Sequence, residues 1–277
     1  MQNAGIAALG LNWRYLAFDV SPDNLRHAIN GAKAMKFIGL NLTVPHKLLA
    51  LEIVDELDES AKTWGAVNTI RFEARDVHGH WQPLTCFSSD VPDEIRAAGF
   101  NTDADALTRA LREDLDLQLL RGAGVLLLGA RGAGRVTALK LASEGVGTLF
   151  LVNRTAQTAE EVAAEIRRRF PRQELVVGYP TTMVDLVINA TSLGLKPEDP
   201  FPVDSKQFSL KRARAVYDLI YRPAETPLLR EAKAAGCRIA NGLGMLLHQG
   251  AQALEIWSGK PAPREAMRRA LENNVYG

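Results

Sequence analysis

A short apolar run followed directly by a cluster of glycines constrains the fold of this chain more than any other feature. Residues 125–128 read Val-Leu-Leu-Leu, and Gly129-Ala130-Arg131-Gly132-Ala133-Gly134 comes next. The pattern predicts a helix over 135–144 and a second apolar strand over 148–152. A strand, a glycine turn, a helix and a further strand are typical of one dinucleotide-binding half of a Rossmann fold. The sequence therefore predicts a doubly wound α/β domain.

One glycine position of the usual turn is occupied by an arginine. Small residues at the start of a helix let backbone N–H groups approach a pyrophosphate, whose charge the helix dipole favours. Gly129, Gly132 and Gly134 are small, but Arg131 stands where the usual pattern has glycine. Arg131 could crowd the pyrophosphate or contact it as a cation. The alternative for the whole motif is a tight turn that binds nothing.

The end of the next strand indicates which dinucleotide would bind. An acidic residue there would bind the ribose 2′-OH of NAD, whereas an arginine accepts the 2′-phosphate of NADP. This chain has Asn153-Arg154-Thr155 and no acid at that point. Arg154 can face the adenine and the phosphate, and Thr155 can donate a hydrogen bond to it. The sequence favours NADP.

The remaining elements alternate between strand and helix, as in α/β proteins. Ser21-Pro22-Asp23 is typical of a helix start, and residues 78–81 look like a hairpin turn. Further strands are predicted over 14–20, 37–44, 174–178, 184–189 and 214–219, and residues 65–70 are predicted to be a turn that runs into a strand. Further helices are predicted over 46–60, 91–98, 103–120, 156–169, 226–235, 243–257 and 263–273.

The composition narrows the possible partners. A net charge of +1 over 277 residues does not point to nucleic acid or to an anionic membrane surface. No apolar run approaches the roughly 20 residues of a membrane span, and the first residues do not resemble a signal peptide. Cys86 and Cys237 lack metal-ligand spacing, so neither a zinc site nor a disulfide framework is expected. We expect a cytoplasmic protein without a metal.

Lys47 follows a strand that Pro45 ends, in the stretch Asn41-Leu42-Thr43-Val44-Pro45-His46-Lys47. Asp103 precedes the helix that leads to the glycine turn. Taken separately, each is an ordinary surface charge. Beside a nicotinamide site, the two make a plausible acid–base pair, because oxidation of a secondary alcohol removes a proton from oxygen as hydride leaves carbon.

The ordered motifs resemble the shikimate dehydrogenase family over nearly the whole chain. Residues 41–47 match its Asn-x-Thr-x-Pro-x-Lys signature. Further matches follow in order at 65–69, 101–103, 153–155, 189–192, 217–221, 226–229 and 242–246, together with Gln249 and Trp257. The resemblance implies NADP-linked interconversion of 3-dehydroshikimate and shikimate, small molecules of aromatic amino-acid synthesis, by a monomer or homodimer.

The resemblance also implies domains and residue roles. A discontinuous substrate-binding domain with a mixed α/β sheet would span 1–103 and 240–277, and a Rossmann-type NADP-binding domain would span 104–239. Lys47 and Asp103 would be the catalytic pair. Substrate would be held by Thr43, Asn68, Tyr221 and Gln249. The cofactor would be lined by Gly129, Ala130, Arg131, Gly132, Ala133, Asn153, Arg154, Thr155, Thr191, Leu219 and Gly242, with Leu219 where many relatives have methionine.

Three departures from the family keep alternatives open. The family normally begins with a strand and a Ser-x-Ser loop that binds the substrate carboxylate, and the printed sequence contains neither. Either the sequence starts late, which we favour, or the protein is a divergent, catalytically impaired NADP-binding relative. The segment 71–99 is longer than the usual hairpin, and Ala104 replaces a hinge glycine. A quinate or quinate/shikimate dehydrogenase is the other enzymatic alternative, and Arg154 argues against its NAD-using members.

Overall fold

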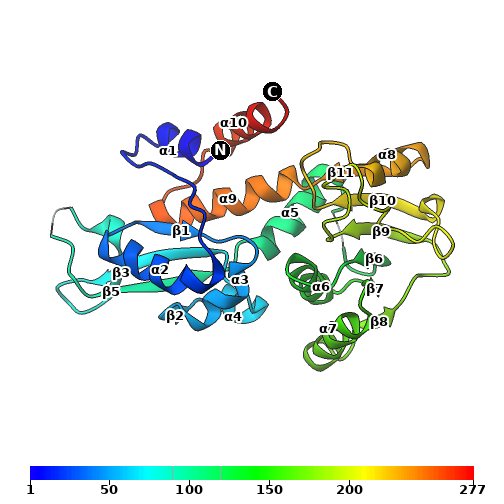
Figure 1. Ribbon diagram of the computed structural model, residues 1–277, viewed down its shortest axis with the longest axis horizontal. Coiled ribbons are helices and arrows are strands. Elements are labelled where there is room, and N and C mark those ends of the chain that lie inside the picture. The colour runs from blue at the N-terminus through cyan, green and yellow to red at the C-terminus, as the bar shows by residue number, and fades with distance from the viewer. Residues whose placement is uncertain (89, 119) are drawn as a thin grey trace. The chain divides into compact units, whose positions relative to one another are not determined.

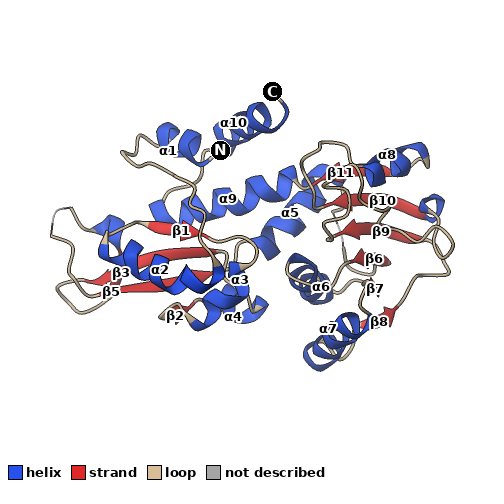
Figure 2. Ribbon diagram, viewed as in Figure 1, coloured by secondary structure: helices blue, strands red, loops and turns tan. Residues whose placement is uncertain are grey.

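A computed structural model describes residues 1–88, 90–118 and 120–277. The chain divides into two compact units. Unit 1 comprises residues 1–103 and 247–273, and unit 2 comprises 104–246 and 274–277. The fold is α/β, as predicted, with a mixed sheet in unit 1 and a parallel sheet in unit 2 (Figures 1 and 2).

Unit 1 is built on a small sheet with strand order β1-β3-β5-β2, and β4 also pairs with β3. Only β2 and β5 run parallel; the other pairs are antiparallel. The strands are β1 (Gly39–Asn41), β2 (Glu56–Leu57), β3 (Thr69–Arg75), β4 (Trp81–Pro83) and β5 (Ile95–Phe100). The α-helices that lie wholly or mostly in this unit are α1 (Gln2–Ala8), α2 (Leu25–Ala34), α3 (His46–Leu49), α4 (Glu59–Trp64) and α10 (Arg264–Tyr276).

The core of unit 1 lies against one face of β3 and β5, where Ile70, Phe72 and Ala97 pack with Leu25 and Ile29 of α2. The second half of α9 (Leu243–Ser258) also belongs to this unit. Its Trp257 donates from Nε1 to the carbonyl of Ile70 at 2.9 Å. A Cβ at Gly39 would lie 2.1 Å from that indole nitrogen, so the close approach of α9 to the sheet requires a glycine at this position.

Three predicted elements of unit 1 are wrong. Residues 14–20 form no strand, and Leu16 and Phe18 are 65% and 61% exposed. The predicted helix over 46–60 is broken, because β2 pairs with β5 and Asp58 caps a new helix by accepting from Ser60 N at 2.8 Å. The predicted helix over 91–98 does not form: residues 91–94 belong to neither a helix nor a strand, and β5 begins at Ile95 and pairs with β3 across six positions.

Unit 2 is a doubly wound domain with strand order β11-β10-β9-β6-β7-β8, and every pair in it is parallel. The strands are β6 (Val125–Leu128), β7 (Thr148–Val152), β8 (Glu174–Val177), β9 (Val184–Asn189), β10 (Ala213–Asp218) and β11 (Arg238–Asn241). The helices are α5 (Asp103–Leu115), α6 (Ala133–Ser143), α7 (Ala156–Arg169) and α8 (Pro227–Ala234), with the first part of α9.

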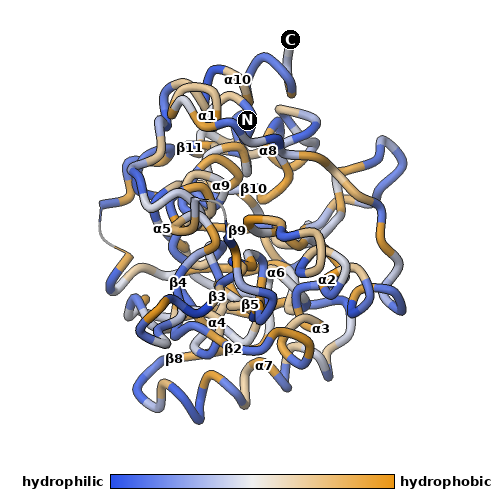
Figure 3. Tube along the Cα trace, turned by 90° about the vertical axis from the view of Figure 1, so that its left-hand side faces the viewer, coloured by the Kyte–Doolittle hydropathy of each residue, from blue (hydrophilic) through white to orange (hydrophobic). Residues whose placement is uncertain are grey.

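Helices of unit 2 cover its sheet with amphipathic faces. Helices α6 and α7 pack beside β6 to β8, and α8 packs against β10 and β11. Hydrophilic and hydrophobic residues alternate along α7 (Figure 3), and its buried residues are Ala159, Val162, Ala163 and Ile166. The predicted helix over 103–120 ends at Leu115, and residue 119 lies outside the described residues.

Candidate functional site

Lys47 and Asp103 form an ion pair within unit 1. Lys47 lies in α3 and Asp103 begins α5, and Nζ is 2.7 Å from Oδ2 although the residues are 56 positions apart. The lysine side chain is 26% exposed and the aspartate side chain 10%. The ammonium is therefore paired with one carboxylate, and about a quarter of the lysine side-chain surface stays accessible. This arrangement suits a group that exchanges a proton with a ligand.

Buried polar contacts hold Asp103 in place. Its backbone N–H donates to Oδ1 of Asn101 at 3.1 Å, and Asn101 Nδ2 donates to the carbonyl of Ala66 at 3.0 Å. On the lysine side, the carbonyl of Lys47 accepts from Val67 N at 2.9 Å. The loop at 66–67 thus contacts Lys47 directly and Asp103 through Asn101.

Asn68 follows that loop and its carboxamide is buried against Thr102. Asn68 Nδ2 donates to Thr102 Oγ1 at 2.9 Å, and Asn68 Oδ1 accepts from Thr102 N at 2.9 Å. Thr43 is exposed in the segment leading to α3, and its carbonyl accepts from His46 N at 2.8 Å. Lys47, Asp103 and Asn68 are therefore joined through adjacent backbone. Gln249 is half-buried on α9 in the same unit.

The predicted cofactor residues of unit 2 follow strands that end in register. Leu128 pairs with Val152 and with Asn189, and Asn189 and Asn241 each pair with Asp218. The segments that follow contain Gly129 to Ala133, Asn153 to Thr155, Thr191, Leu219 and Gly242, so all of them leave one edge of the sheet. Ligands of doubly wound sheets bind at the carboxyl ends of the strands. Tyr221, the predicted substrate residue, leaves the same edge and is 38% exposed.

Glycines are required where this edge is most tightly packed. Gly129 has φ +101°, and a Cβ at Gly134 would lie 2.3 Å from the carbonyl oxygen of Gly129. A Cβ at Gly242 would lie 2.0 Å from the carbonyl oxygen of Leu219. The glycine turn therefore brings the N-terminus of α6 close to β6. This leaves backbone N–H groups at a helix start, as a bound pyrophosphate requires.

Asn153 connects the glycine turn to the end of β7. Its Oδ1 accepts from Ala130 N at 3.1 Å, and its Nδ2 donates to the carbonyl of Thr155 at 2.9 Å. Arg131, Arg154 and Thr155 are exposed beside this contact. The two segments that the sequence assigns to the cofactor are thus held together by one carboxamide.

Asp218, Asn189 and Thr226 form a buried polar cluster next to Thr191 and Leu219. Sequence reasoning did not single out this cluster. Asp218 is fully buried and accepts from Thr226 Oγ1 at 2.7 Å, Asn189 Nδ2 at 3.0 Å and Ile220 N at 3.1 Å. Asn189 Oδ1 in turn accepts from Thr191 Oγ1 at 2.7 Å. Burial raises the pKa of the Asp218 carboxyl to about 6, although these hydrogen bonds act in the opposite direction. The sequence signals were a polar residue at the end of β9 and of β10 and the family matches at 189–192, 217–221 and 226–229, none of which assigns a role to Asp218.

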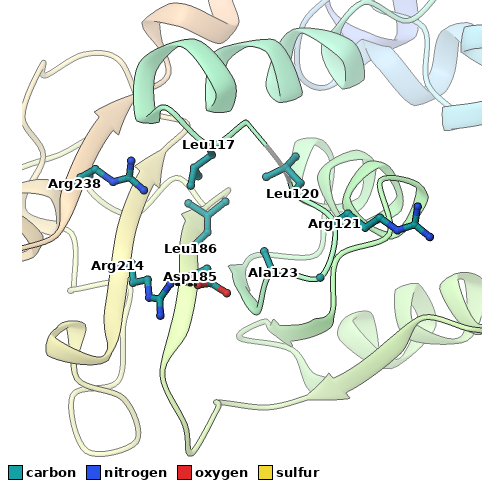
Figure 4. Close-up of a pocket in the computed structure, with 9 residues that line it drawn as sticks. Leu117, Leu120, Arg121, Ala123, Asp185, Leu186, Arg214 and Arg238 are labelled. Carbon is teal, nitrogen blue, oxygen red and sulfur yellow. Dashed lines mark ion pairs between the residues drawn. The ribbon is translucent and has the colours of Figure 1, made fainter.

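A cavity of about 280 Å³ in unit 2 does not belong to this edge. Arg121, Arg214, Arg238 and Asp185 line it at or just before the starts of the strands, together with Leu117, Leu120 and Leu186 among others (Figure 4). Asp185 pairs with Arg214 at 3.2 Å, and Arg121 points away from the other labelled residues. The cavity therefore lies at the amino edge of the sheet, opposite the predicted cofactor residues. Within the described residues, no helix is both long and apolar enough to cross a membrane.

Comparison with known proteins finds the same family at both ends of the chain. The family model described as the shikimate dehydrogenase substrate binding domain matches residues 1–70, and that of the shikimate 5′-dehydrogenase C-terminal domain matches 242–272. The shikimate dehydrogenase (NADP(+)) of Methanopyrus kandleri is 38% identical over 98% of this chain and 89% of its own length.

Solved structures share the fold over almost the whole chain. A shikimate dehydrogenase in complex with NADP+ superposes with a TM-score of 0.82 at 34% identity, covering 99% of this chain and 90% of its own. A ligand-free 5-ketofructose reductase of a Gluconobacter species superposes with a TM-score of 0.78 at 34% identity, covering 99% and 92%. The likeness therefore extends through both units.

Proposed function

The chain belongs to the shikimate dehydrogenase family, and we propose that it catalyses the reversible NADP-dependent reduction of 3-dehydroshikimate to shikimate, a step in aromatic amino-acid biosynthesis. The observation that carries the proposal is the pairing of Lys47 with Asp103 at 2.7 Å in unit 1. We propose that unit 1 binds the substrate and unit 2 binds NADP. Cys86 and Cys237 are both free thiols, which agrees with a cytoplasmic enzyme.

In the proposed mechanism, Lys47 handles the proton of the substrate hydroxyl. In the direction of reduction, the ammonium of Lys47 donates a proton to the oxygen as the carbonyl becomes an alcohol. The carboxylate of Asp103 keeps the ammonium oriented and stabilises its charge. In the direction of oxidation, the neutral amine accepts the proton from the hydroxyl. General acid–base catalysis of this kind contributes a factor of about 10² to 10⁴ in rate.

Three further side chains of unit 1 are proposed to hold the substrate. Thr43 offers a hydroxyl beside the start of α3, and Gln249 offers a carboxamide on α9. Asn68 retains one amide N–H beyond the one that Thr102 accepts, and the described residues provide no partner for it. Tyr221, which leaves the carboxyl edge of unit 2, stays a predicted substrate residue on the strength of the family resemblance. These groups suit the hydroxyls and the carboxylate of shikimate.

The carboxyl edge of unit 2 fits a nicotinamide dinucleotide phosphate. The turn at Gly129 to Ala133 provides the start of α6 for the pyrophosphate, and Asn153 to Thr155 lie where the ribose 2′-phosphate is recognised. Thr191, Leu219 and Gly242 complete the proposed lining. When bound, NADP(H) supplies or accepts the hydride.

The decisive test of the catalytic role is Lys47→Ala, with Lys33→Ala as the matched control. Lys33 also pairs with an aspartate of unit 1, Asp55, but it lies outside the proposed site. We expect Lys47→Ala to lower kcat for shikimate oxidation by about 10² or more, and Lys33→Ala to leave it within about twofold. Circular dichroism should show that both variants are folded. Wild-type turnover by Lys47→Ala would disprove the assigned role.

A second candidate is the reduction of another polyhydroxylated ketone. The observation that favours it is the 5-ketofructose reductase structure, which is as similar in sequence as the shikimate dehydrogenase structure. Values of kcat/KM for shikimate, quinate and 5-ketofructose, each measured with NADP(H) and NAD(H), distinguish the candidates. We expect the highest value for shikimate with NADP. A higher value for either of the other substrates would replace the proposed one.

A further inference from the structure

We propose that Arg131 acts with Arg154 as a second cation for the ribose 2′-phosphate, so that Arg131 sets the preference for NADP over NAD. The inference rests on the proposed function, because it assumes that unit 2 binds a nicotinamide dinucleotide at its glycine turn. It assigns a specific role to the residue that departs from the usual glycine pattern. The 2′-phosphate carries a charge of about −1.5 to −2, which two guanidinium groups can balance.

The backbone tolerates an arginine at this point of the turn. The non-glycine residues with positive φ in the described chain are Lys36 and Asp116, so Arg131 has an ordinary backbone conformation. The positions where a Cβ would collide with backbone, Gly129 and Gly134, remain glycine. Arg131 is therefore accommodated without strain, and its side chain is exposed. This argues against simple disruption of the turn.

Hydrogen bonds place Arg131 beside Arg154. Ala130 N donates to Asn153 Oδ1 at 3.1 Å, and Gly129 N donates to the carbonyl of Val152 at 2.8 Å. Arg131 directly follows Ala130, and Arg154 directly follows Asn153, the two residues joined by the 3.1 Å hydrogen bond. The end of β7, to which Arg154 belongs, is where doubly wound domains recognise the adenosine ribose. Arg131 therefore stands on the ribose side of the turn.

Both guanidinium groups are available for a ligand. Among the described residues, neither Arg131 nor Arg154 has a carboxylate partner. Arg135, one turn further along α6, is in contrast held by Glu165 at 2.7 Å. An unpaired arginine binds phosphate through two parallel N–H donors. The two free cations at this corner of unit 2 thus match a dianion better than the neutral ribose of NAD.

Calorimetric binding of NADP and NAD to the full chain tests the inference through Arg131→Gln and Arg154→Gln. We expect each substitution to weaken NADP binding by about 10- to 100-fold, the worth of a charge-assisted hydrogen bond, and to leave NAD binding within about twofold. Arg131→Lys should fall between wild type and Arg131→Gln, because it keeps the charge and loses the paired donors. Arg121→Gln, an exposed arginine at the amino edge, is the matched control.

Each other outcome overturns the inference in a recognisable way. An equal loss for NADP and NAD in Arg131→Gln would mean that Arg131 contacts the pyrophosphate. An equal gain for both would mean that Arg131 crowds the site, and no change would mean that it is only a solvated charge. Adenosine 2′,5′-bisphosphate should bind to wild type more tightly than adenosine 5′-monophosphate, and Arg131→Gln should weaken only the binding of the bisphosphate. If the wild-type chain binds neither dinucleotide, the proposed function itself fails, whatever Arg131 does.

Discussion

Replacing Asp218 by asparagine should make unit 2 more stable at neutral pH and leave its stability nearly unchanged in mild acid. Asp218 is fully buried at the end of β10, and burial raises the pKa of its carboxyl to about 6 from an ordinary value of 3.8. The ionised form is therefore held at a cost in the folded protein. Asparagine has the same shape and no charge, so Asp218→Asn removes that cost.

The magnitude and sign follow from proton linkage. Between pH 4 and pH 6 the folded carboxyl holds a proton that the unfolded one has released, so wild-type stability falls as the pH rises through this range. The gap between the folded pKa of about 6 and the ordinary value of 3.8 corresponds to about 2–3 kcal/mol at pH 7. Below pH 4 both carboxyls are protonated and the cost vanishes. The free energy of unfolding of Asp218→Asn minus that of wild type should thus rise by about 2–3 kcal/mol between pH 4 and pH 7.

Urea denaturation of both proteins across this pH range is the assay. All four tryptophans, Trp13, Trp64, Trp81 and Trp257, lie in unit 1. Their fluorescence reports unit 1, and far-ultraviolet circular dichroism reports both units, so recording the two signals separates the transition of unit 2. At each pH, the free energy of unfolding of wild type is subtracted from that of the variant. This difference cancels the titration of every other group that the substitution leaves undisturbed.

Asp204→Asn is the control for a carboxylate of the same unit. Asp204 is exposed, and hydrogen bonds from the Gln207 side chain and the Lys206 amide lower its pKa. The stabilising effect of the Asp204 carboxylate is present above the pKa that this group has in the unfolded chain, and it is lost only as the pH falls below about 4. The free energy of unfolding of Asp204→Asn minus that of wild type should therefore be nearly constant from pH 4 to pH 7. A constant difference for Asp218→Asn over the same range would refute the argument from burial.

Two further predictions concern the packing of unit 2 and the exposed segment 14–20 of unit 1. Gly242→Ala should lower the free energy of unfolding by about 2 kcal/mol or more, because the added Cβ would lie 2.0 Å from a carbonyl oxygen. In the control Gly124→Ala the nearest atom to the added Cβ is 3.8 Å away, so urea denaturation should show little change. Leu16→Lys combined with Phe18→Lys should reduce concentration-dependent association in analytical ultracentrifugation. Both side chains are exposed in a segment whose Tyr15 hydrogen-bonds to Asn41 of β1, the strand at one end of the sheet order. Val77→Lys, in the turn between β3 and β4, should not change the association.

The Rossmann half could be predicted from the sequence almost residue by residue. Strands 125–128, 148–152 and 184–189 and helix 156–169 are confirmed with the predicted bounds. Strands buried on both faces of a parallel sheet are continuous apolar runs, and short connections place each helix directly after its strand. Here local pattern and tertiary structure agree, so local reasoning is sufficient.

Unit 1 could not be predicted in the same way because its strands depend on distant partners. Residues 91–98 have a helix start at Asp90 and a stop at Gly99, yet Ile95–Phe100 pairs with β3 over six positions. Residues 14–20 have the composition of a strand but no pairing partner among the described residues. Propensity is a weak prior where pairing is non-local, and tertiary contacts decide the outcome.

The candidate site was predictable only in part for a related reason. Lys47 and Asp103 are 56 positions apart, and each alone is an ordinary charge. The family resemblance supplied the pairing that the residues could only make plausible. Asp218 was passed over because a polar residue that ends a buried strand has no local signature. Its hydrogen bonds join segments that follow different strands.

Three asparagine side chains each join two segments at the predicted site residues. Asn68, Asn153 and Asn189 each use the carbonyl to accept from a backbone N–H, at 2.9, 3.1 and 3.1 Å, and the amide nitrogen to donate to a second group. The donated bonds reach Thr102 in unit 1 and the carbonyl of Thr155 and the carboxylate of Asp218 in unit 2. A carboxamide donates at one atom and accepts at another while remaining neutral at every physiological pH. An ionised aspartate in their place would leave the donated bond unmade, and at Asn68 and Asn189 it would also bury a charge, so the asparagines fix the loops of each unit without adding a charge of their own.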